Sequence, residues 1–189
     1  MSRKMNIIKK QRIGFGPRVG AFIIDSFIIT ILASILMALF MESTFNAFIS
    51  GQLTEAIMNN SATPQFTSQE AYDEMMRVSL FIAHFSTLYM IIEAFLGATP
   101  GKMLMGIKIG TQDGKTGDIW LYFPRFALKN GSVLLELAGR ITGIGLISSI
   151  AGLLGMAVFF GCFFVLGEKR QALHDTIART AVFRKNELT

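Results

Sequence analysis

Two carboxylates lie inside apolar stretches of this chain, where an ionised group is costly. Asp25 lies in the run from Pro17 to Phe40, and Glu93 lies in the run from Val78 to Gly97. A carboxylate in the middle of a lipid-embedded helix costs on the order of 2.5 to 3.5 kcal/mol on insertion scales, so each should face protein or water. Helical rise places both in the same half of a membrane. Together they could hold a proton or a small cation; alternatively, each meets a separate partner and fastens helices together.

Other charged residues give weaker chemical signals. Arg18 and Asp25 are seven residues apart, about 10 Å along a helix, which is too far for a direct ion pair. His174 and Asp175 are adjacent and point in different directions on regular structures, so they do not indicate a metal pair. The glycine spacing of "GATPGK" at residues 97–102 does not fit a phosphate-binding loop. We find no nucleophile with a base, so we expect no enzyme, metal or cofactor.

The composition indicates that a membrane positions these residues. The chain has 189 residues, 51% of them hydrophobic, and its mean hydropathy is +0.48. These values are too apolar for an ordinary soluble domain of this size. The single cysteine, Cys162, excludes an internal disulfide.

Three stretches are long enough to cross a hydrocarbon core of roughly 30 Å, namely residues 19–41, 78–97 and 145–167. The leader, residues 1–18, is basic and contains no acid, whereas the loop 42–77 is mostly acidic. Because Lys and Arg near span ends stay in the cytoplasm, the leader should be cytoplasmic and the loop should lie outside.

A fourth membrane segment is needed because the tail, residues 168–189, is also basic and should be cytoplasmic. The candidate is residues 120–139, short or partly interfacial, with Arg125 and Lys129 reaching to the interface. The predicted fold is therefore an all-α membrane protein, a bundle of four membrane segments. It would be a multi-pass membrane protein with both termini cytoplasmic.

Three local patterns predict smaller features. Thr67 and Glu70 have capping-box spacing, so the second helix should begin near Ser68. Asp113-Gly114, in the inner connection 98–119, predicts a small cytoplasmic β-hairpin. Glu136 and Arg140, four residues apart, should neutralise each other.

Three motifs together resemble the RDD family of bacterial membrane proteins, named for one arginine and two aspartates. They are "RVGAFIID" from residue 18, "GATPGKMLMGIKI" from residue 97 and "RQALHDTIARTAVF" from residue 170. The matching positions are Arg18, Asp25 and Asp175, the last in a pair with His174, and residues 19–167 form the RDD-like transmembrane domain. The resemblance implies a location in the bacterial inner (plasma) membrane and transport of unidentified ligands, with sodium/proton antiport in some members. We predict that Asp175 supplies the ionic partner that Arg18 lacks within its own helix.

Two functions follow as hypotheses. The first is a transporter, or transport subunit, that moves a proton or small cation through a site using Asp25 and Glu93. The second is a non-transporting scaffold or accessory subunit whose buried charges are structural. In either case we expect as partners the lipid bilayer, including anionic lipid at the cytoplasmic face, and a second copy of the chain or another membrane protein. We expect no nucleic-acid partner.

Overall fold

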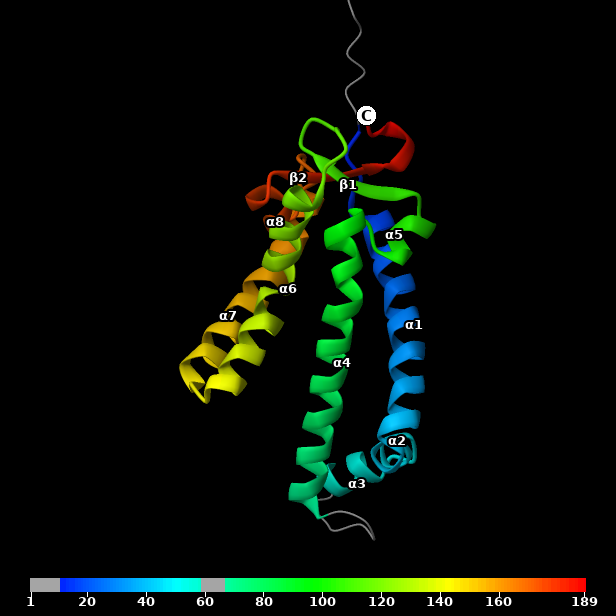
Figure 1. The fold of residues 1–189 in the computed structure, drawn as a ribbon, viewed down its shortest axis with the longest axis vertical. Coiled ribbons are helices and arrows are strands. Elements are labelled where there is room, and N and C mark those ends of the chain that lie inside the picture. The colour runs from blue at the N-terminus through cyan, green and yellow to red at the C-terminus, as the bar shows by residue number, and fades with distance from the viewer. Residues whose placement is uncertain (1–10, 59–66) are drawn as a thin grey trace, which may run out of the picture. The chain divides into compact units, whose positions relative to one another are not determined.

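The computed structural model describes residues 11–58 and 67–189, which are mainly helical (Figure 1). Contacts divide the described residues into two units, one formed by residues 11–25 with 90–189 and one formed by residues 26–58 with 67–89. The elements in chain order are α1 (Phe15–Phe40), α2 (Glu42–Ile49), α3 (Gln52–Met58), α4 (Ser68–Leu96), α5 (Pro100–Leu104), β1 (Ile107–Thr111), α6 (Ile119–Thr142), α7 (Gly145–Cys162), α8 (Leu173–Ile177) and β2 (Thr180–Arg184), with short 3-10 turns at Phe163–Leu166 and Lys185–Glu187.

Among the described residues, three helical stretches are long and apolar enough to cross a membrane: Phe15–Phe40, Ser68–Leu96 and Gly145–Leu166. Many of their large apolar side chains are exposed, for example those of Phe22 and Leu153. Exposed apolar side chains are favourable in contact with lipid and unfavourable in contact with water. The predicted all-α membrane fold is confirmed. The segment predicted at residues 120–139 is also a helix, α6, but it has 24 residues and is longer than expected. That α6 spans or lies in an interface stays a prediction.

Helices α6 and α7 pack against each other as an antiparallel pair joined by a tight turn. Gly143, with a φ of 71°, ends α6 in a left-handed conformation that favours glycine. At Gly139 an added Cβ would lie 2.6 Å from the Ser148 hydroxyl, so only glycine allows this approach. The absence of a side chain at Gly139 thus allows α6 and α7 to approach closely.

The small sheet has two antiparallel strands that are far apart in the sequence. Ile107 in β1 lies opposite Arg184 in β2, and Thr111 lies opposite Thr180. The hairpin predicted at Asp113-Gly114 forms only as a single antiparallel bridge, between Gly110 and Thr116. The tight turn does form, since Lys115 accepts a backbone hydrogen bond from Thr111, but the partner strand comes from the C-terminal end of the chain.

The core of the first unit joins the sheet to the helices around it. It contains Ala21 of α1, Ile109 of β1, Tyr122 of α6 and Val182 of β2, all buried. Gly97 ends α4 with a φ of +68°, and a Cβ there would lie 2.5 Å from the Tyr122 ring. The sheet is therefore packed closely against the helices that carry the buried charges of this unit.

The second unit holds the part of α1 from Ser26 onward, α2, α3 and most of α4. Its buried residues are small or aliphatic: Ala47, Leu53, Ala56 and Ala71. The predicted capping box at the start of α4 is present, because Glu70 accepts a hydrogen bond from the Thr67 amide at 2.8 Å and Thr67 accepts one from the Glu70 amide at 3.3 Å.

Candidate functional site: a buried charge cluster

The first unit contains a cluster of charged side chains that its helices hold away from solvent. The carboxylates are almost completely buried, with exposed fractions of 2% for Asp25, 1% for Glu93 and 0% for Asp175. Buried ionised groups persist only when they are paired and hydrogen-bonded. We call this group the charge cluster; its members are Arg18 and Asp25 of α1, Glu93 of α4, Lys102 of α5, Arg125 and Lys129 of α6, and His174 and Asp175 of α8.

Asp175 is the anion at the α8 side of the cluster. Its Oδ2 accepts a hydrogen bond from Arg18 at 2.5 Å, and its Oδ1 accepts one from Arg125 Nε at 2.7 Å. The backbone amide of Ala172 donates a third bond, which caps α8. Burial alone would raise the pKa of Asp175, but the two nearby guanidiniums hold it well below its usual range. The predicted ion pair between Arg18 and Asp175 is present.

Glu93 is the second anion, and three cations surround it. Lys102 donates to its Oε2 at 2.6 Å, Lys129 approaches the same oxygen at 3.3 Å, and Arg125 contacts Oε1. Arg125 therefore bridges Glu93 and Asp175, two carboxylates 82 positions apart in the sequence. Burial lowers the pKa of Lys102 to about 8.

Asp25 has a different role, because its oxygens hold the start of α5. Thr99 donates its hydroxyl to Oδ2 at 2.5 Å, and the Gly101 amide donates to Oδ1 at 2.7 Å. Thr99 is also the N-cap of α5 and accepts from the Lys102 amide, while Pro100 takes the first helical position. The "GATPGK" segment is thus a tight helix start that Asp25 fastens to α1.

His174 is neutral in this setting. Burial first, and then the charge of Arg125, lower the pKa of His174 to about 2. A neutral imidazole at this site accepts a hydrogen bond from Arg125 through Nε2, at 3.3 Å, and carries its proton on Nδ1. In the described part of the chain no three metal-ligating side chains come together, and the contact of the His174 ring is with Arg125.

The cluster carries one more positive than negative charge when His174 is neutral and all four bases are protonated. Its acids are Asp25, Glu93 and Asp175, and its bases are Arg18, Lys102, Arg125 and Lys129. Burial lowers the pKa of Lys129 well below its ordinary value, so this base gives up its proton most readily. An additional small cation next to Glu93 would therefore meet repulsion unless one of these bases moved or lost its proton. The cluster is suited to holding helices together. It can exchange a proton only through one of its basic side chains.

The sequence identified only part of this arrangement. It named Arg18, Asp25, Glu93 and Asp175, and the structure brings these residues into one unit. The expectation that Arg125 reaches to an interface is wrong: its side chain is 3% exposed and pairs with two acids. Lys102 and Thr99 were missed as well. The available signal was a basic pair on α6, Arg125 and Lys129, four residues apart on one helical face and in need of an acidic partner.

An exchange of charges between Arg18 and Asp175 should not restore stability. We expect Arg18→Asp combined with Asp175→Arg to be no more stable than either single variant. The reason is that Arg125 donates to Asp175 as well, so the exchange would place two guanidiniums together. Thermal unfolding in detergent would measure this. A double variant that melts close to the wild type would contradict the bridging role of Arg125.

Three apolar helical stretches and a charge cluster buried among the helices define a helical membrane protein. The sequence model of the RDD family matches residues 12–179, and the chain belongs to this family. The matched range contains Arg18, Asp25 and Asp175. Comparisons with curated proteins and with solved structures gave no match.

Proposed function

We propose that this RDD protein is a non-transporting membrane scaffold or accessory subunit. The observation that carries the proposal is the contact of buried Arg125 with both Glu93 and Asp175. This contact ties the end of α4 to α8, through α6, in an environment where breaking an ion pair is costly. The two ion pairs of Arg125 thereby fix the position of the small sheet and of α8 relative to the helices. It presents a defined surface to a partner.

The contacts of the two candidate transport carboxylates favour this proposal. A cation-transport site needs carboxylate oxygens that a cation can reach. The oxygens of Glu93 already meet three basic side chains, and those of Asp25 accept hydrogen bonds from Thr99 and Gly101. Occupation by sodium would require these contacts to break.

The proposed setting is the bacterial inner membrane, with several passes and with both termini in the cytoplasm. The excess of Lys and Arg in the leader and the tail supports this orientation. The partner would be a second copy of the chain or another membrane protein, with anionic lipid at the cytoplasmic face. We propose no enzymatic activity.

Flux measurements in proteoliposomes test the proposal. We expect no protein-dependent movement of sodium or protons, because the acids of the charge cluster are occupied by protein donors. The experiment compares purified wild-type protein with Asp25→Asn and Glu93→Gln, using a pH-sensitive dye and a sodium tracer. The matched control is Glu136→Gln, which removes a carboxylate that pairs with Arg140 at the edge of α6.

A specific flux that both Asp25→Asn and Glu93→Gln abolish, and that Glu136→Gln leaves intact, would overturn the scaffold proposal. It would support the second candidate function, proton movement. One observation favours that candidate: Lys102 touches Glu93 at 2.6 Å, and burial lowers the pKa of Lys102 to about 8. A lysine with such a pKa exchanges its proton near neutral pH. Proton flux through this pair would change near pH 8 and disappear in Lys102→Met.

A further inference from the structure

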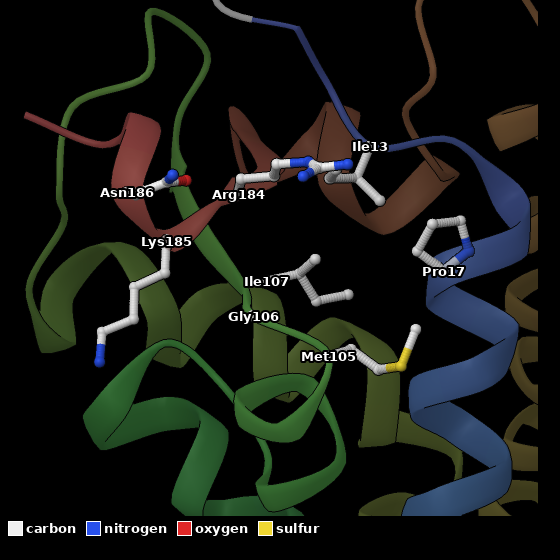
Figure 2. Close-up of a pocket in the computed structure, with 8 residues that line it drawn as sticks. All are labelled: Ile13, Pro17, Met105, Gly106, Ile107, Arg184, Lys185 and Asn186. Carbon is white, nitrogen blue, oxygen red and sulfur yellow. The ribbon is translucent and has the colours of Figure 1, made fainter.

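A cavity of about 660 Å³ opens beside the start of α1, apart from the charge cluster (Figure 2). Its lining comes from three segments that are distant in the sequence: the residues around the start of α1, the end of α5 with the start of β1, and the end of β2. The volume lies within the range of roughly 300 to 1,000 Å³ that is typical of small-ligand sites.

The chemistry of the lining is divided between apolar and basic residues. Ile13, Pro17 and Met105 supply apolar surface, while Arg184 and Lys185 are the charged residues that the described part of the chain contributes. Figure 2 shows the Arg184 side chain extending toward Ile13, and the Lys185 side chain extending in another direction. A lining with this composition is complementary to a molecule that is anionic at one end and apolar at the other.

Arg184 differs from the other arginines of this region in having no partner of its own. Among the described residues, its side chain forms no ion pair or hydrogen bond, and it is exposed. Arg12, by contrast, donates to the Lys169 carbonyl and to Gln171, and Arg170 donates to the Arg12 carbonyl. The guanidinium of Arg184 is therefore available to an external anion.

The position of the cavity in the fold identifies the source of that anion. Pro17 lies in the first turns of α1, and α1 is a candidate membrane span that begins at Phe15. Phe15, at the start of α1, is 38% exposed, and Met105, in the lining of the cavity, is 40% exposed. A cavity at the end of a span lies at the depth of lipid headgroups, and basic pockets there bind acidic ones.

We propose that this cavity binds one anionic phospholipid. Its phosphate contacts Arg184, with Lys185 adding positive potential, and the first part of an acyl chain lies against Met105 and Pro17. We assign the site to a lipid because a soluble phosphate would not bury the apolar residues of the lining, whereas an acyl chain would. This inference rests on the membrane location in the proposed function and is independent of whether the chain moves ions.

Lipid titration of the purified chain in neutral detergent tests the proposal. The probes are phosphatidylglycerol, phosphatidylcholine and soluble glycerol 3-phosphate, and binding is read by native mass spectrometry. We expect tighter binding of phosphatidylglycerol than of phosphatidylcholine, and about a fivefold loss of that affinity in Arg184→Gln. Met105→Gln should weaken phosphatidylglycerol binding without changing the response to glycerol 3-phosphate.

The matched control is Lys115→Gln, which removes one exposed positive charge from the same unit outside the cavity. It should leave phosphatidylglycerol affinity unchanged. Equal affinity for the two lipids would overturn the proposal, as would equal effects of Arg184→Gln and Lys115→Gln. Binding of glycerol 3-phosphate as tight as that of phosphatidylglycerol would overturn the assignment to a lipid. Because the titration measures no flux, a failure of the scaffold proposal would be seen separately.

Discussion

The variant Arg125→Met is expected to unfold at a markedly lower temperature than the wild type. Arg125 is 3% exposed and pairs with Glu93 and Asp175, so its loss leaves two buried carboxylates short of a cation. Breaking a buried ion pair by removing one partner costs about 3 to 5 kcal/mol. For a chain of this size that corresponds to a decrease in Tm of about 10 °C, measured by thermal unfolding in detergent.

The control on the same helix is Arg140→Met. Arg140 pairs with Glu136 four residues earlier, but its side chain is 42% exposed, and exposed pairs contribute about 0.5 kcal/mol or less. Equal melting of Arg125→Met and Arg140→Met would show that Arg125 has no bridging role.

Local features of this fold could be predicted from the sequence. The capping box of Thr67 and Glu70, the turn at Asp113-Gly114 and the pair of Glu136 with Arg140 all form as predicted, because each needs only residues within four positions. The apolar stretches are equally direct, since crossing lipid requires length and hydropathy and nothing more specific.

Long-range contacts could be predicted from the sequence only in part. The pairing of Arg18 with Asp175 came from the family motif together with the expected side of the membrane, and not from spacing. The pairing of β1 with β2 could not be derived, because a five-residue strand carries no mark of a partner about 70 residues away. A turn signal favours the nearest partner, and at Asp113-Gly114 that partner supplies only the bridge between Gly110 and Thr116.

The contacts of Glu93 were missed for a further reason. Positive residues near the end of a span are usually read as topology signals that reach the interface. Arg125 and Lys129 instead turn toward Glu93, because a buried acid attracts the bases of neighbouring elements more strongly than the interface does. In membrane proteins an acid inside a span is therefore a reason to assign nearby bases to it first.

The substitution Gly101→Ala is expected to be the second most damaging. A Cβ at this position would clash with the Ala21 carbonyl and would lie 2.8 Å from the Asp25 carboxyl carbon. Both neighbours belong to α1, so α5 would have to move away and lose its hydrogen bonds to Asp25. Overpacking costs about 1 to 3 kcal/mol, and stranding a buried acceptor adds a similar amount. We expect a decrease in Tm of about 5 to 10 °C in detergent.

The matched control is Gly16→Ala, in the first turn of α1, where an added Cβ meets nothing within 4 Å. Because alanine is the better helix former, this variant should be neutral or more stable by up to about 1 kcal/mol. The contrast separates the effect of close approach from the general effect of replacing glycine. If both variants melt alike, α5 is not held by Asp25, and the "GATPGK" segment must owe its sequence to something other than contact with α1.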